Sequence, residues 1–143
     1  MKLVDTNVLL YALNEADPKH DHARTWLDGA LGGTEAVGFA WAVLLAFVRL
    51  STKAGLFPRP LTAHGALDRV RSWLMQPPAV VVEPTVRHLD ILRGLLGSLG
   101  TGANLVDDAH LAALAIEHGA EIVSYDSDFG RFEGLRWRVP PSA

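Results

Sequence analysis

Short apolar runs alternate along this chain with longer segments in which apolar residues recur every three or four positions. The short runs predict strands and the periodic segments predict amphipathic helices. The expected strands are a first one that ends at Asp5, and then residues 36–39, 79–82, 121–124 and 135–139. The expected helices cover residues 8–13, 20–31, 41–53, 62–76, 85–96 and 104–118. This alternation predicts one α/β domain over residues 1–143, a three-layer α/β/α sandwich with a mainly parallel central sheet.

Four segments carry more specific expectations. The β-branched run at residues 79–82 lies between prolines, which predicts a buried strand. The helix that Thr85 opens is expected to turn Leu89, Leu92 and Leu96 inward. Residues 97–102 are rich in glycine and are expected to form a flexible loop, a mobile lip of a cleft. The helix at residues 41–53 is apolar nearly all round, so it is either fully buried or shared with a dimer or partner interface.

Composition narrows the chemistry. The chain has 143 residues, 49% of them hydrophobic, and no cysteine, which excludes disulfides, thiolate metal sites and thiol nucleophiles. No apolar stretch approaches the roughly 18 to 20 residues of a membrane span, and no signal peptide is visible. A cytoplasmic protein is therefore expected. The net charge is −3, so any nucleic-acid contact must come from local patches. Arg49, Lys53 and Arg59 form the best such patch; the alternative is that they are solvated charges.

Carboxylates follow two of the predicted strands. Asp5 ends the first strand, and Asp126 and Asp128 come directly after residues 121–124. In a parallel sheet the carboxyl ends of neighbouring strands share one edge, where ligands bind. Asp108 is expected in the first turn of its helix, on the small apolar face that packs on the sheet, whereas Asp107 points about 100° away toward solvent.

Each acid also has a plain structural explanation, as a turn residue or a helix N-terminal anion. Clustered carboxylates, however, repel one another and raise one another's pKa values unless a cation joins them. A site built from oxygen ligands without cysteine favours Mg²⁺ or Mn²⁺. Such an ion shields phosphate charge and lowers the pKa of an attacking water, which is why nucleases use acidic clusters.

Three segments together resemble the PIN-domain family, and specifically VapC-like toxin ribonucleases. They are Leu3-Val4-Asp5-Thr6-Asn7-Val8-Leu9, the stretch from Val106 to Ala115 around Asp108, and Ile122-Val123-Ser124-Tyr125-Asp126-Ser127-Asp128-Phe129. The resemblance implies an endoribonuclease that depends on Mg²⁺, with Mn²⁺ as a possible substitute, and that acts as the toxin of a toxin–antitoxin system. It also implies a homodimer, a VapB-like antitoxin partner and an RNA substrate.

The resemblance assigns roles to individual positions. Asp5 and Asp108 correspond to the family's metal ligands. Asp126 is expected to orient the attacking water or a second ion, with Asp128 assisting. Asn7 and Ser124 correspond to supporting polar residues that orient the site.

The chain departs from the family pattern at one position. The family usually carries a glutamate on the helix after the second strand, and here Ala46 stands where that residue is expected. This favours an alternative: a catalytically degenerate PIN domain that binds RNA or an antitoxin without cleaving. A third reading, a phosphatase of the haloacid dehalogenase kind, needs a second aspartate two residues after Asp5, where this chain has Asn7.

The histidines are given no catalytic role. His20 and His22 diverge by about 200° on a helix, so they are expected to be polar residues at a helix start. His110 and His118 are expected at the surface or at a helix end.

Overall fold

The computed structural model describes residues 1–100 and 102–142. Its strands are β1 (Lys2–Val4), β2 (Val37–Phe39), β3 (Ala79–Val81), β4 (Glu121–Val123) and β5 (Trp137–Arg138). Its α-helices are α1 (Thr6–Leu13), α2 (His20–Leu31), α3 (Trp41–Thr52), α4 (Ala63–Leu74), α5 (His88–Leu99) and α6 (Val106–His118). Two short 3-10 helices, η1 (Ala103–Leu105) and η2 (Ser127–Arg131), come just before α6 and after β4. The predicted order of strands and helices is confirmed.

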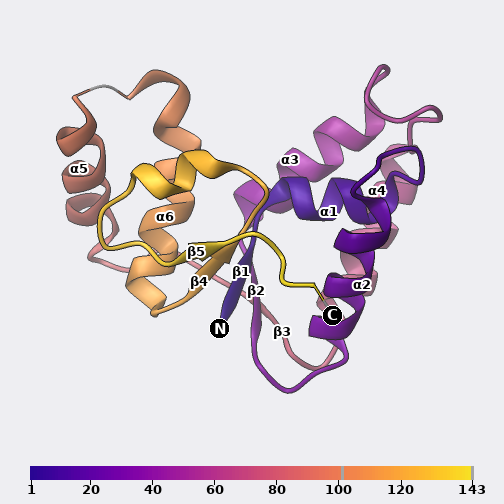
Figure 1. Ribbon diagram of the computed structural model, residues 1–143, viewed down its shortest axis with the longest axis horizontal. Coiled ribbons are helices and arrows are strands. Elements are labelled where there is room, and N and C mark those ends of the chain that lie inside the picture. Colours follow the sequence, from indigo (N-terminus) through magenta and orange to yellow (C-terminus); the bar gives the residue numbers. More distant parts are fainter. Residues whose placement is uncertain (101, 143) are drawn as a thin grey trace.

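The sheet has the strand order β3-β2-β1-β4-β5, and every neighbouring pair is parallel. Figure 1 shows it between two layers of helices, with α5 and α6 on one face and α1 to α4 on the other. Parallel strands need crossover connections, and these helices supply them on both faces. The predicted α/β/α sandwich is confirmed.

The strand order places a topological switch point beside β1. From β1 the chain passes outward through β2 to β3 on one side, and later returns to β4 and β5 on the other. Val4 pairs with Val123, so the residues that follow β1 and β4 emerge together at the carboxyl edge of the sheet. Ligands of open α/β sheets bind in the crevice at this kind of point.

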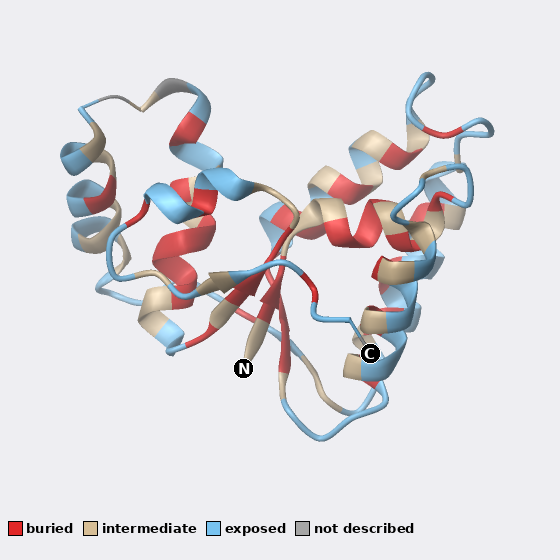
Figure 2. Cartoon of the chain, in the orientation of Figure 1, coloured by how far each residue is buried: buried red, intermediate tan, exposed pale blue. Residues whose placement is uncertain are grey.

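The core is centred on β1, β2 and β4, whose side chains are buried almost throughout (Figure 2). Gly38 permits a close approach inside it, because a Cβ there would lie only 2.8 Å from a methyl carbon of Val82. Interiors of this density leave little room for added atoms, so any larger side chain at position 38 would force its neighbours to shift.

The helix α3 is not fully buried. Val43, Leu44 and Phe47 are buried on its inner side. Trp41 and Leu45 remain 46% and 57% exposed on its outer side. Of the two alternatives for this apolar helix, complete burial within the described chain is therefore wrong.

The prediction of a buried third strand is wrong. β3 is an edge strand that pairs only with β2, and Val80 and Val81 are 38% and 40% exposed. A β-branched run reports strand propensity, and its place in the sheet is decided by distant pairing partners. Val82, just beyond the strand, is the buried member of the run.

The prediction for the fifth helix is wrong for Leu89, which is 64% exposed. Leu92 and Leu96 are half-buried and pack against the core, as predicted. The helix begins at His88, and Leu95 is its buried residue. His88 lies close to the direction of Leu95 round the helix, so it takes the inward position next to Leu89, which turns about 100° away.

The predicted loop at residues 97–102 is wrong in its first half. α5 continues through Leu99, and Gly100 ends it in a left-handed conformation with φ of 69°, which glycine adopts without strain. Thr101 lies outside the described residues. Within the described ranges no helix has the length and apolarity needed to span a membrane.

Candidate metal centre

Asp5 leaves β1 and caps α1. Its Oδ1 accepts a hydrogen bond from the Thr6 backbone N–H at 2.8 Å, and its own N–H donates to Val123 of β4 at 3.1 Å. An aspartate at this position satisfies one of the free N–H groups at the helix start. Asp5 therefore has a structural role as the cap of α1, in addition to placing a charged group at the switch point.

Two polar side chains hold the other oxygen of Asp5. The hydroxyl of Ser124, directly after β4, donates to Asp5 Oδ2 at 2.7 Å, and Asn7 Nδ2 donates at 3.3 Å. Asn7 also donates to Ser124 Oγ at 3.0 Å and accepts from the Tyr125 N–H at 3.1 Å. The structure thus brings both predicted supporting residues into contact with the predicted metal ligand.

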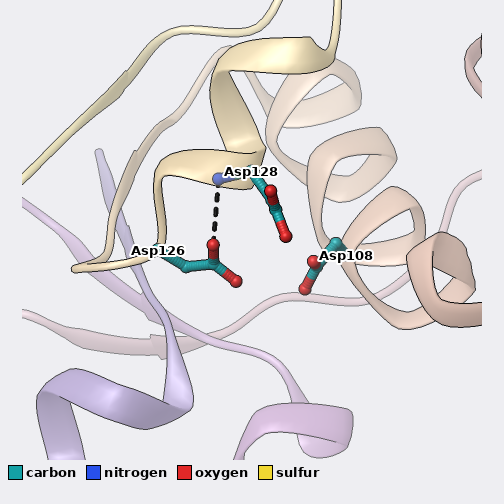
Figure 3. A group of neighbouring side chains, drawn as sticks. All are labelled: Asp108, Asp126 and Asp128. Atoms are coloured by element: carbon teal, nitrogen blue, oxygen red, sulfur yellow. Dashed lines mark hydrogen bonds between the residues drawn. The ribbon is translucent and has the colours of Figure 1, made fainter.

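Asp108, Asp126 and Asp128 converge beside this network (Figure 3). Each offers one carboxylate oxygen, and these atoms all lie within 4.8 Å of one another. Asp108 comes from the first turn of α6, Asp126 precedes η2 and Asp128 lies within it. Asp126 Oδ1 accepts the N–H of Asp128 at 2.9 Å, which fixes the turn that aims both side chains at Asp108.

The pKa values of the two predicted metal ligands show that burial and mutual repulsion disfavour their charged forms. Burial, and then the charges of Asp126, Asp5, Asp128 and Asp107, raise the pKa of Asp108 from 3.8 to about 6. The pKa of Asp5 is also raised, chiefly by burial and further by the charge of Asp126, although hydrogen bonds from Ser124 and Thr6 oppose the shift. The neighbouring acids therefore disfavour the charged forms of Asp108 and Asp5, and a bound cation would relieve this repulsion.

A cavity of about 490 Å³ opens beside these acids, between α1, α3 and α6. Asp5, Asp108 and Asn7 line it, and so do Ala46 and Arg49 of α3. The position at which the sequence lacks a glutamate therefore does face the acidic site. A carboxylate is missing there, and a methyl group stands in its place.

The predicted basic patch is only partly assembled at this cavity. Arg49 is exposed and lines the cavity wall, and Lys53 is exposed one turn further on. Arg59 lines a different cavity together with Asn14 and Phe57. Arg49 is thus the member of the patch that lies beside the acids.

The other predictions for polar residues have mixed outcomes. Asp107 is exposed, as predicted. His20 and His22 start α2 and are bound separately, to the Tyr11 carbonyl at 2.9 Å and to the Tyr125 hydroxyl at 2.6 Å. His110 was expected at the surface, and this is wrong: it is half-buried and lines the cavity. Its position two residues after Asp108 is the one signal in the sequence that pointed to the site.

The donor set fits a hard divalent cation. The ligand atoms at hand are carboxylate oxygens, from Asp108, Asp126 and Asp128, with Asp5 adjacent. Mg²⁺ and Mn²⁺ prefer such oxygen ligands and are commonly held by one or two carboxylates together with water and substrate phosphate. The raised pKa values point the same way, because the cluster is electrostatically incomplete without positive charge.

Comparison with known proteins agrees with the fold. The family model described as PIN domain matches residues 2–135. The chain belongs to the PIN-domain family.

Its relatives place it more narrowly, among VapC-like PIN domains. It is 65% identical over 142 residues to Ribonuclease VapC37 of Mycobacterium tuberculosis, a match that covers 99% of both chains. It is 41% identical over 140 residues to Ribonuclease VapC33 of the same species, covering 98% of each chain.

Solved structures share the fold. A VapBC2 complex from Rickettsia felis, bound to promoter DNA, matches with a TM-score of 0.72 at 16% identity, covering 96% of this chain and 97% of that one. VapC20 of Mycobacterium tuberculosis, described as a toxin that cleaves the sarcin–ricin loop, matches with a TM-score of 0.66 at 18% identity, covering 95% and 99%. At these identities the likeness concerns the fold alone.

We expect Asp108→Asn to stabilise the metal-free protein near neutral pH. The folded-state pKa of Asp108, about 6, lies above its ordinary value of 3.8, so its stabilising contribution is complete below pH 3.8 and is lost as pH rises through 6. The full shift corresponds to about 3 kcal/mol, which solvent screening reduces to about 1 kcal/mol at this half-exposed group. In chelator at about pH 7.5 the variant should melt about 2–4 °C above the unmodified chain.

The difference in melting temperature should disappear below pH 3.8, where Asp108 is neutral in both the folded and the unfolded chain. Asp90→Asn, which changes an exposed aspartate in the first turn of α5, is the control and should shift the melting temperature by less than about 1 °C. Calorimetry or circular dichroism measures each transition. A variant that melts below the unmodified chain at neutral pH in chelator would contradict the strained carboxylate.

Proposed function

We propose that this protein is a Mg²⁺-dependent endoribonuclease, the toxin of a VapBC-like toxin–antitoxin system, in which Mn²⁺ can replace Mg²⁺. The observation that carries the proposal is the convergence of Asp108, Asp126 and Asp128 next to the cavity that Asp5 and Asp108 line. The high identity to proteins named VapC ribonucleases supports the choice of RNA as the substrate.

Asp5 and Asp108 are the proposed metal ligands. Asp126 and Asp128 are close neighbours of Asp108, because each places a carboxylate oxygen within 4.8 Å of one from Asp108. The ion, when bound, supplies positive charge that shields the phosphate and lowers the pKa of the attacking water. Ser124 and Thr6 keep Asp5 oriented by donating to its two oxygens. Asp126 is proposed to orient the water for attack on phosphorus.

Arg49 is proposed to bind a phosphate of the RNA strand. Its side chain is exposed on the α3 wall of the cavity, across from α6. An arginine there reduces the repulsion between the acidic site and a polyanion. Its planar guanidinium group can bind a phosphate through two parallel hydrogen bonds. Because the chain carries a net charge of −3, such local contacts have to supply the attraction.

A VapB-like antitoxin and a second copy of the chain are the proposed partners, in the cytoplasm. Exposed Trp41 and Leu45 lie on the outer side of α3, next to the cavity. Exposed aromatic and aliphatic side chains of this size are typical of interaction surfaces. Light scattering on the purified chain tests the dimer: a monomer mass at high concentration would contradict it.

We expect the purified chain to cut RNA only with a divalent cation. Total RNA incubated with Mg²⁺ or Mn²⁺ should yield discrete fragments, and chelator should prevent their formation. Asp108→Asn should lower the rate at least about 100-fold, because loss of even an outer-shell partner of a metal commonly costs 10- to 100-fold. Asp90→Asn, which changes an exposed aspartate in the first turn of α5, is the control and should cleave within about threefold of the unmodified chain. Equal cleavage with and without chelator would reject the proposal.

Ala46→Glu tests the alternative of a degenerate, non-cleaving domain. The new carboxylate would enter the cavity that Asp5 and Asp108 line, so it should tighten Mn²⁺ binding, measured by calorimetry. If the chain is already a nuclease, the cleavage rate should change by less than about tenfold. Ala46→Gln, equal in size but uncharged, should leave Mn²⁺ affinity unchanged. Cleavage that arises only in Ala46→Glu would establish the degenerate reading.

A further inference from the structure

A chain of hydrogen bonds connects α5 to the cavity through two histidines. Glu117 Oε2 lies 2.6 Å from His88 Nδ1, and His88 Nε2 lies 2.9 Å from His110 Nδ1. The two imidazole rings meet edge to face, with their centroids 4.8 Å apart and an interplanar angle of 74°. Glu117, His88 and His110 therefore form one relay, which we call the histidine relay.

The relay follows from the helical spacing. His110 and Glu117 are seven residues apart on α6, so they lie on one face about 10 Å apart along the axis. His88 is the first residue of α5 and fills the space between them. Neither residue of α6 could reach the other, and the imidazole of His88 has two nitrogens on opposite edges with which to bridge them.

The far end of the relay is firmly anchored. Glu117 Oε1 accepts the Thr85 N–H at 2.9 Å and the Thr85 hydroxyl at 2.6 Å, and its side chain has no exposed surface. Burial alone would raise the pKa of Glu117, but these bonds and that of His88 outweigh it and hold the pKa below its ordinary value. An ionised carboxylate fixes the proton of His88 on Nδ1 and so fixes the ring.

The near end of the relay reaches the acidic cavity. His110 lines the cavity together with Asp5, Asp108 and Arg49. Because His88 carries its proton on Nδ1, its Nε2 accepts a hydrogen bond from His110 Nδ1–H. The other nitrogen of His110, Nε2, is then an acceptor, and it has no hydrogen-bond partner among the described residues. Asn7, the cavity's remaining side chain with a nitrogen, is committed to Asp5 and Ser124. Arg49 and His110 thus offer the nitrogen contacts available to a ligand, one on α3 and one on α6.

We propose that His110 is a substrate-contacting residue whose Nε2 accepts a hydrogen bond from a 2′-hydroxyl of the RNA, and that His88 and Glu117 are the residues that position it. The inference rests on the proposed ribonuclease function and deepens it. A strand that presents a phosphodiester to the acids has to pass between the two walls of the cavity. A ring held in place beforehand loses little conformational entropy on binding, which strengthens a contact that would otherwise be weak.

The test is steady-state cleavage of a short RNA by the full chain, with KM and kcat measured separately. His110→Ala should raise KM about three- to tenfold, the effect of one lost hydrogen bond, and change kcat less than about twofold. His88→Ala should raise KM in the same direction. Combined, the two substitutions should raise KM no more than His110→Ala alone, because His88 acts only through His110.

Controls separate this role from a structural tie between α5 and α6. His118→Ala removes an exposed histidine of the same helix, bonded to the Glu83 carbonyl, and should leave KM unchanged. His110→Gln, which offers an acceptor oxygen at a similar reach, should recover part of the lost affinity. Melting temperatures identify any variant whose loss comes from unfolding.

RNA analogues identify the oxygen. A single 2′-deoxy sugar removes a hydroxyl, and a single methylphosphonate removes a charged phosphate oxygen, at each position near the cleaved bond. A 2′-deoxy analogue should raise KM for the unmodified chain but not for His110→Ala, which marks the contact, whereas a methylphosphonate analogue that alone shows this pattern would overturn the assignment to a 2′-hydroxyl. Wild-type KM in His110→Ala, or KM effects of His88→Ala and His110→Ala that multiply, would overturn the inference while cleavage persists. Absence of cleavage by the unmodified chain would instead reject the ribonuclease proposal itself.

Discussion

Mutual repulsion among four carboxylates at one edge of the sheet is the constraint on which the rest of the site depends. Asp5, Asp108, Asp126 and Asp128 lie close enough that the charges of the other three all raise the pKa of Asp108. Charges of one sign in a partly buried place cost free energy, and folding tolerates that cost only where other interactions exceed it. The buried hydrophobic residues of β1, β2 and β4 directly below supply the opposing stabilisation.

A different local feature of the fold fixes the position of each acid, so the cluster does not depend on a single interaction. Asp5 is a helix cap, Asp108 sits in the first turn of α6, and Asp126 caps η2 by accepting from Asp128. An anion is favoured at a helix N-terminus in each case. Parallel pairing of β1 with β4 then brings these termini together. Helix stability and the proposed metal binding therefore both favour acidic residues at these positions.

The sequence was sufficient to predict this centre because its signals are local. A carboxylate after a strand end and another on the sheet-facing side of a helix can be read without knowing the fold in detail. β3 shows the opposite case, because nothing within residues 79–82 reveals that the strand lies at an edge. The inward position of His88 was equally hidden. It depends on the start of α5 three residues later than expected and on a partner, Glu117, 29 residues further along.

Ala46 and His110 together suggest how such a site changes its balance of charge. A glutamate at position 46 would add a further negative group to the cavity, which would favour a cation but repel the phosphate backbone. The methyl group of Ala46 removes that repulsion, and the neighbouring wall offers Arg49 and the ring of His110. Affinity for the metal and affinity for the polyanion then depend on different residues. Affinity for the metal is set by the aspartates at the strand ends. Affinity for the polyanion is set by Arg49 of α3 and by His110, which His88 of α5 holds in place.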